Sequence, residues 1–336
     1  MKTLYDIAKA TGFSTSTVSR ALNNSGYCNP KTKAIIEKAA KEMNYRPSNA
    51  GRVLKSQKSD RVMFCIPDIM NPFYFNMIRA ISERLSLNDY YFLLSYTMHD
   101  ESEEFKYLNL LQEHYADGMI MVSFDFNEEL VEEMRKSNFP IVATNMIPNL
   151  KEDDNFDIVY VDHIKAMYIA TEHLILNGHK DICVVVGNLS EQTSQERLSG
   201  FEQAMNKYNI EFSDDNIFIG DYTIDSGKLI AEEISQSKKK FTGIVCSNDL
   251  MSMGIVSKLQ YKGFDIPNDF SIISLDNTEY ADAIHPSLTS VDMKQYELGN
   301  LSCKLLLEKI IDERKGSKVI RLEPELVIRE SVRELN

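Results

Sequence analysis

The sequence predicts two folds in one chain: a small all-α head that contains a helix-turn-helix, and an α/β body with two doubly wound parallel sheets. Charge divides the chain, because residues 1–60 carry eleven basic and four acidic side chains, a net charge of +7, whereas the other 276 residues carry 26 basic and 46 acidic ones, a net charge of −20. Three stretches of helical periodicity fill the head, and from Arg61 onward β-rich runs alternate with helical stretches of ten residues or more.

A basic head on an acidic body is typical of a polyanion-binding module joined to a part with another task. A Lys-rich solvated surface is the alternative. Within the head, Thr3 can cap a first helix that Gly12 ends, and Ser14 can cap a second after a three-residue break. Asn29, followed by Pro30 at the first helical position, begins a third. Two helices joined by a tight Gly-containing turn predict a helix-turn-helix whose second helix enters the major groove of DNA.

The outward face of the second predicted helix consists of hydrogen-bonding side chains, Thr15, Ser16, Ser19, Arg20 and Asn23. Arg can chelate guanine and Asn the adenine edge, each pair contributing ~1–3 kcal/mol of discrimination. Phosphates would be held by the helix N-terminus and by the hydroxyls of Tyr5, Ser14, Thr17 and Ser19. Ordinary solvent-facing surface is the alternative for such a helix.

Residues 48–59 are polar and basic except for Ala50, Val53 and Leu54, which have helical spacing. A helix of barely three turns is marginal in isolation, so this segment could order only when it packs against a twin and against DNA. A flexible linker is the alternative.

The body contains eight predicted strands, at residues 62–67, 90–96, 118–122, 140–144, 181–186, 217–220, 243–246 and 271–275. Ligands of parallel sheets bind at the carboxyl ends of the strands, where polar residues recur in this chain. We expect a small-molecule site there, with aromatic residues to stack on a hydroxyl-rich ring, although turn or helix-cap duty explains many single Asp and Asn residues.

Composition and motifs exclude several classes of protein. No apolar run reaches the roughly 18 residues of a membrane span, and the start MKTLYDIAKA lacks a secretory signal, so we expect a cytosolic chain. The five cysteines form no C-x-x-C pair and the six histidines never have metal-ligand spacing, which disfavours disulfides and metal sites. Without a phosphate loop or a nucleophile elbow, the sequence predicts no enzyme and no cofactor.

Residues 3–47 resemble the head of the LacI/GalR family of bacterial transcription regulators, most specifically in the strings Ser16–Arg20 and Asn44–Pro47. The resemblance implies that Thr15, Ser16 and Arg20 read bases. It further implies contacts to the DNA backbone or bases from Tyr5, Thr17, Asn23 and Tyr27, and from Asn49, Ala50, Arg52 and Leu54 of a hinge helix, with Leu54 as a minor-groove wedge. Gly51 stands where the family usually has Ala, which weakens the hinge helix by ~1 kcal/mol.

The resemblance continues through the body, which is similar to the periplasmic-binding-protein fold in segments such as PDIMNPFY (67–74), ERLSGF (196–201) and SNDLMSMG (247–254). It implies an effector cleft lined by Asp68, Phe73, Tyr74, Arg197, Tyr222, Asp249 and Asp276, and less specifically by Asn145 and Asn248. Glu191 stands where purine-binding members place a basic residue, and His163 replaces a common Asn, which disfavours a purine. Arg197 with Asp276 would suit the vicinal hydroxyls of a sugar, the expected effector, and Arg197 could equally bind the carboxylate or phosphate of an acidic sugar.

The resemblance also implies the domain organisation and the partners. Residues 1–47 would be the DNA-binding domain, 48–60 the hinge, 61–160 plus about 291–320 the N-terminal subdomain, and 161–290 plus about 321–336 the C-terminal subdomain. We expect a homodimer, since no leucine heptad follows VIRESVRELN, that binds a pseudo-palindromic operator in double-stranded DNA in the bacterial cytoplasm. The effector would change the angle between the subdomains and so the DNA affinity, by release or by recruitment.

Three alternatives stay open at this point. One is a solute-binding protein without a DNA function, which would leave the basic head unexplained. Another is a regulator that uses a phosphocarrier protein or a non-sugar corepressor. An α/β enzyme is the third, and it lacks a nucleophile or cofactor motif.

Overall fold

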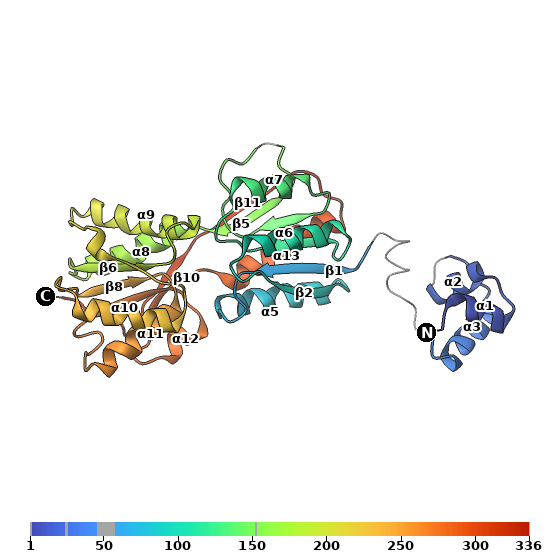
Figure 1. Cartoon of the computed structure of the whole chain (residues 1–336), viewed down its shortest axis with the longest axis horizontal. Coiled ribbons are helices and arrows are strands. Elements are labelled where there is room, and N and C mark those ends of the chain that lie inside the picture. Colours follow the sequence, from blue (N-terminus) through green and yellow to red (C-terminus); the bar gives the residue numbers. More distant parts are fainter. Residues whose placement is uncertain (1, 24–25, 46–57, 152, 336) are drawn as a thin grey trace. The chain divides into compact units, whose positions relative to one another are not determined.

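The computed structural model describes residues 2–23, 26–45, 58–151 and 153–335, which belong to two compact units, Met1–Ser59 and Asp60–Asn336 (Figure 1). The predicted hinge contacts Asn49, Ala50, Arg52 and Leu54, together with Gly51, lie outside the described residues.

Among its described residues, the first unit has three helices, which confirm the predicted ones: α1 (Leu4–Thr11), α2 (Thr15–Asn23) and α3 (Pro30–Glu42). Thr3 and Asp6 make a capping box at the start of α1, and the hydroxyl of Ser14 accepts a hydrogen bond from the Thr17 amide at the start of α2. The apolar stripes meet in one small core in which Ile7 and Ile36 are fully buried. Packing of these stripes fixes the angle at which α2 presents its polar face.

The second unit contains two sheets of six strands each. The first has the order β11-β5-β4-β3-β1-β2 and its pairs are parallel. Its strands are β1 (Arg61–Ile66), β2 (Tyr91–Tyr96), β3 (Gly118–Met121), β4 (Ile141–Ala143), β5 (Asp157–Val161) and β11 (Val319–Leu322). Its helices are α5 (Phe73–Ser86), α6 (Glu101–Gln112), α7 (Glu128–Lys136) and α13 (Gln295–Ile310).

Alternation along the strands of the first sheet explains why helices cover both of its faces. Phe64 and Ile120 belong to the apolar cluster that contains the buried residues of α5 and α13, whereas their neighbours Cys65 and Met121 belong to the cluster of α6 and α7. A parallel sheet that is apolar on both faces must be covered on both, which the crossover helices do.

The second sheet has the order β12-β10-β9-β8-β6-β7, and β12 pairs antiparallel with β10 at its edge. Its strands are β6 (Ile182–Val186), β7 (Ile217–Ile219), β8 (Gly243–Cys246), β9 (Ser271–Asp276), β10 (Thr289–Asp292) and β12 (Glu325–Val327). Its helices are α8 (His163–Leu176), α9 (Gln192–Lys207), α10 (Ile224–Gln236), α11 (Asp249–Tyr261), α12 (Glu279–Ala283) and the 3-10 turn η1 (Asp214–Asn216). Figure 1 shows α8 and α9 on one face of this sheet and α10 and α11 on the other.

The chain passes between the two sheets three times, after β5, after β10 and after β11. The eight predicted strands are confirmed, and the sequence reasoning missed β5, β10, β11 and β12. These four strands are short and several of their residues are polar, so the sequence has no long apolar run there that would predict a strand. In the part of the chain that the structure describes, no helix is both long enough and apolar enough to span a membrane.

Candidate DNA-reading head and effector cleft

The polar face of α2 is presented to solvent. The predicted DNA contacts Tyr5, Ser14, Thr15, Ser16, Arg20, Asn23 and Tyr27 are exposed, and Thr17 and Ser19 are half-buried. Local hydrogen bonds order this face, since the Ser14 and Thr17 hydroxyl oxygens lie 2.9 Å apart and the Asn23 amide donates to the Ser19 hydroxyl at 3.2 Å. The arrangement leaves the reading face accessible to a polyanion.

A narrow cleft lies at the carboxyl ends of strands from both sheets, where it encloses about 30 Å³. Seven of the nine residues predicted to bind the effector line it: Phe73, Tyr74, Asn145, Arg197, Tyr222, Asn248 and Asp276. The sequence reasoning committed to none of the other five, Asn71, Val122, Phe124, His163 and Thr193. Phe124 lies three residues after the end of β3, so a search for ligand-binding residues at the carboxyl ends of strands would have included it.

The two remaining predicted residues do not line the cleft. Asp249 is fully buried, and its carboxylate accepts hydrogen bonds from Ser274, Ser290 and Thr278. These bonds tie the start of α11 to strand ends and leave the carboxylate fully engaged by the protein. Asp68 is half-buried and accepts a hydrogen bond from the Met70 amide at 2.8 Å, a local turn contact.

Buried polar groups dominate the electrostatics of the cleft. Arg197 is only 5% exposed, and its buried Nε has no hydrogen-bond partner. The buried Nδ1 of His163 has no hydrogen-bond partner either. Burial and the nearby Arg197 charge hold the pKa of His163 well below its ordinary value, so its ring is neutral. Burial and the neighbouring Asp249 hold the pKa of Asp276 well above its ordinary value. The cleft therefore offers one firm positive charge among groups that can donate or accept hydrogen bonds.

Hydrogen bonds join the two sheets' loops beside the cleft. The amide and hydroxyl of Thr193 both donate to the Phe124 carbonyl, at 3.3 and 3.2 Å. Asn145 donates to Ser123 and to Thr193, and Gln192 donates to the Met146 carbonyl at 3.0 Å. The start of α9 is thus tied to the ends of β3 and β4.

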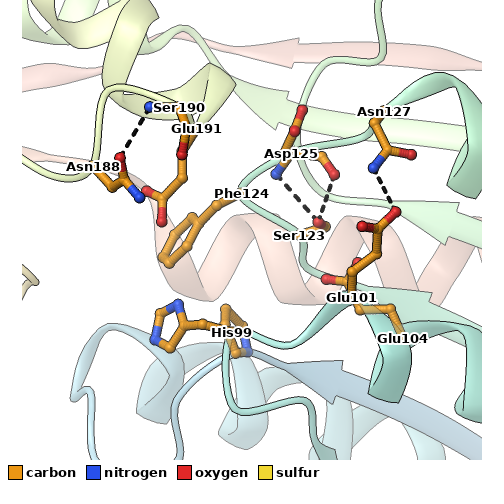
Figure 2. A pocket seen from close by; sticks show the side chains of 11 residues that line it. His99, Glu101, Glu104, Ser123, Phe124, Asp125, Asn127, Asn188, Ser190 and Glu191 are labelled. Carbon is orange, nitrogen blue, oxygen red and sulfur yellow. Dashed lines mark hydrogen bonds between the residues drawn. The ribbon is translucent and has the colours of Figure 1, made fainter.

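A second cavity of about 290 Å³ adjoins the cleft across Phe124, which lines both (Figure 2). Its lining is acidic, with Glu101, Glu104, Asp125 and Glu191, and the His99 ring stacks on Phe124 at 5.2 Å. Burial, reinforced by the neighbouring carboxylates, raises the pKa of Glu104 to about 7.

A helix-turn-helix head joined to a body of two mainly parallel sheets, with a polar cleft at their strand ends, defines the class of effector-responsive DNA-binding regulators. Residues 3–48 match the family described as bacterial regulatory proteins of the lacI family, and residues 59–330 match the periplasmic binding proteins and sugar binding domain of the LacI family. The chain belongs to the LacI family and is a DNA-binding transcriptional regulator, as the resemblance of its head and body predicted.

Individual relatives agree with this assignment. The chain is 32% identical over 337 residues, the whole of both chains, to the HTH-type transcriptional repressor PurR of Vibrio parahaemolyticus serotype O3:K6. It is also 32% identical over 338 residues to catabolite control protein A of Priestia megaterium, covering 98% of this chain and 99% of the relative. Among solved structures it resembles a transcriptional regulator CelR–cellobiose complex, with a TM-score of 0.74 and 25% identity over 98% of this chain and 100% of that one.

Proposed function

We propose that this chain is a homodimeric repressor that binds a pseudo-palindromic operator and whose DNA affinity is set by a carbohydrate in the cleft. The cleft itself carries this proposal, because it combines a buried arginine and a buried acid with aromatic rings. Phe73 and Tyr74 meet edge to face at 5.2 Å, which offers an apolar wall to the C–H face of a sugar ring.

The unpartnered Arg197 Nε and His163 Nδ1 support a hydroxyl-rich effector. A buried donor or acceptor left without a partner costs roughly 1–3 kcal/mol, which a ligand hydroxyl would recover. The side-chain carbonyl of Asn145, whose amide nitrogen is already bonded within the protein, and the acid of Asp276 add groups that recognise hydroxyls without demanding a charge. Cellobiose in the CelR complex is a ligand of this chemical class.

In the head, we propose that Thr15, Ser16 and Arg20 read base edges. Tyr5, Ser14, Thr17, Ser19, Asn23 and Tyr27 would position the head on phosphates and flanking bases. For the hinge, Leu54 as a wedge and Asn49, Ala50 and Arg52 as DNA contacts remain proposals, as do the domain boundaries 1–47, 48–60, 61–160 with about 291–320, and 161–290 with about 321–336. The proposed location is the bacterial cytoplasm, where the operator is, and we propose binding alone, without an enzymatic step.

For the homodimer, we propose an interface on β2, the edge strand of the first sheet. Tyr91, Leu94 and Tyr96 on this strand are exposed, and Ile69 and Met70 are exposed on the loop that precedes α5. An exposed apolar edge strand favours association, because burial removes both the apolar surface and the unpaired backbone groups from water.

A purine corepressor is the second candidate, because the family to which this chain belongs has purine-binding members, and relatives of this chain carry the name HTH-type transcriptional repressor PurR. Glu191 argues against it, because it stands where the resemblance expects a basic residue in purine-binding members, and its carboxylate accepts hydrogen bonds from Ser194 and from Tyr222, which lines the cleft.

The test is a thermal-shift screen of the full chain against cellobiose, ribose, glucose 6-phosphate and hypoxanthine. A ligand at 100 times its Kd stabilises by ~2.7 kcal/mol. Stabilisation by a neutral sugar, together with a changed affinity for operator DNA selected from a random library, is the expected result. If hypoxanthine alone stabilised the chain, a purine would replace the carbohydrate as the proposed effector. A chain that lacks residues 1–60 should lose DNA binding and keep the ligand response.

A further inference from the structure

The cavity of about 290 Å³ that adjoins the cleft is large enough to hold a ligand of its own (Figure 2). Its volume is close to the lower end of the roughly 300–1,000 Å³ that small-molecule sites occupy. The loops after β1, β2, β3 and β6 and the start of α6 form its wall. Because these loops follow the carboxyl ends of parallel strands, the cavity has the usual position of a ligand site.

Four carboxylates line this cavity, which we call the acidic cavity, and no lysine or arginine is among the described residues that line it. None of the four has an ion-pair partner in the part of the chain that the structure describes. At an adjacent position of α6, by contrast, Glu103 pairs with Lys106 at 2.8 Å. The four unpaired acids are Glu101, Glu104, Asp125 and Glu191.

Glu104 is the acid that the protein encloses most, since it is only 7% exposed. The Ser123 hydroxyl lies near its carboxylate, but this hydroxyl also lies 3.0 Å from the Asp125 carbonyl oxygen. A hydroxyl has one proton, so only one of the two acceptors can receive it. Among the residues drawn in Figure 2, Ser123 is bonded to Asp125 and none is bonded to Glu104. The buried carboxylate therefore lines the cavity with acceptor sites that the described residues leave unfilled.

The unpaired acids destabilise the chain while the cavity holds no cation. Burial raises the pKa of Glu104 to about 7, and burial together with the nearby Glu101 raises the pKa of Asp125. A cation in the cavity would stabilise both ionised carboxylates and lower both pKa values. Acids that oppose folding and line a cavity are typical of binding sites, where function outweighs the loss of stability.

The arrangement of the acids favours an organic cation over a metal ion. They come from α6, from the loop after β3 and from the loop after β6, so they surround the cavity. Among the described residues, no three acidic, histidine or cysteine side chains lie close enough together to hold a metal ion. Pro67 and Phe124 add apolar surface, which suits the methylene groups of an aliphatic chain.

We propose that the acidic cavity binds an aliphatic diamine or polyamine. One ammonium group would pair with the buried Glu104, and a second would pair with Glu101 or Asp125, which are exposed at the rim. The resemblance assigns none of these three acids to effector contact, and none of them lines the cleft. The proposal is therefore independent of what the cleft binds.

Isothermal titration calorimetry of the full chain with 1,4-diaminobutane at pH 8 tests the proposal. At this pH both ammonium groups are charged and Glu104 is largely ionised. Saturable binding is expected, with weaker binding of butylamine, which has one charge, and no binding of the neutral butane-1,4-diol. If neither 1,4-diaminobutane nor spermidine bound at concentrations up to about 10 mM, the proposal would fail.

Glu104→Gln is expected to weaken the binding of 1,4-diaminobutane by about tenfold or more, because a charge-assisted hydrogen bond is lost. The variant should fold, since it removes an unpaired buried charge. Glu103→Gln makes the same change at the adjacent position of α6 and should bind within about twofold of the wild type. Equal affinities of Glu104→Gln and the wild type would overturn the proposal. Displacement of the amine by an equal concentration of Mg²⁺ would also overturn it, in favour of an inorganic cation. No measurement uses a sugar or DNA, so failure here is separate from failure of the sugar screen.

Discussion

Single residues in this chain have roles that depend on what surrounds them more than on their type. Arg20 and Arg197 illustrate this, since one is exposed on α2 and the other is buried in α9. The exposed arginine can form a bidentate pair with a base, whereas the buried one lines the cleft with its Nε unpartnered, where we propose that it binds the effector. Similarly, the Asp249 carboxylate accepts hydrogen bonds from within the protein, although the sequence predicted that it binds the effector together with Asp276.

Arg20→Ala is expected to weaken binding to the selected operator by ~1–3 kcal/mol, or roughly 5- to 150-fold in Kd, because a base-reading pair is lost. Since Arg20 is exposed, the thermal midpoint should not change. The measurement is fluorescence anisotropy on operator and on scrambled DNA, with the exposed α3 variant Lys38→Ala as control. Equal losses on both DNAs in Arg20→Ala would mean that Arg20 contacts phosphate and not a base.

Glu104→Gln is expected to stabilise the chain at pH 8 and to have little effect at pH 4.5. Because burial raises the folded-state pKa of Glu104 from 4.5 to about 7, ionisation of this carboxyl begins to cost stability near pH 4.5 and destabilises the fold increasingly as the pH rises toward 7. The gain at pH 8 should reach at most ~3 kcal/mol. Thermal unfolding at the two pH values measures it, with the exposed Glu129→Gln as control. A gain of the same size at both pH values would contradict the assignment.

At the scale of elements, helix pairs in the body approach closely because glycines face backbone atoms across the contact. Gly254 in α11 lies against Ile224 at the start of α10, and a Cβ there would be 2.1 Å from the Ile224 carbonyl oxygen. Gly200 in α9 meets the Ile164 carbonyl of α8 in the same way. A backbone oxygen cannot swing aside as a long side chain can, so the helices themselves must move to admit a methyl group.

Gly254→Ala should therefore destabilise the chain by ~1–3 kcal/mol despite the higher helix propensity of alanine. Ser257→Ala, at an exposed position of the same helix, controls for propensity and should be neutral or slightly stabilising. Urea denaturation followed by circular dichroism gives both values. A stabilised Gly254→Ala would show that α10 and α11 can separate without loss of packing.

At the scale of the whole molecule, opposite charges on the two units of the chain suit two tasks. The head, with its excess of basic side chains, can release counterions from DNA, and the acidic body adds nothing to that binding. Operator affinity should accordingly fall steeply with salt, and the proposed dimer would bring two heads to one operator.

Leu94→Asp on the β2 edge is expected to convert the proposed dimer to a monomer, because it places a charge within the proposed apolar interface. Sedimentation velocity measures the change, and affinity for a pseudo-palindromic operator should fall with it. Tyr115→Asp, which alters an exposed aromatic residue outside β2, is the control. A Leu94→Asp chain that stayed dimeric would place the interface on another surface.

Sequence reasoning reached the three head helices, eight strands, the family and seven cleft residues, because caps, apolar periodicity and strand ends are local signals. It did not reach β5, β10, β11 or β12, whose few residues are stabilised by neighbours distant in the chain. Phe124 and Thr193 lie 69 residues apart and became cleft partners only through the hydrogen bonds that join the two sheets.

By itself, the sequence determined the division into a basic helical head and an acidic α/β body, because charge and apolar periodicity depend only on the order of residues along the chain. Only the tertiary structure decided that Asp249 is internally satisfied and that the Tyr222 ring lies against Gly187. The physical reason is that occupancy and hydrogen-bond satisfaction depend on distances between residues far apart in sequence, and packing alone sets those distances.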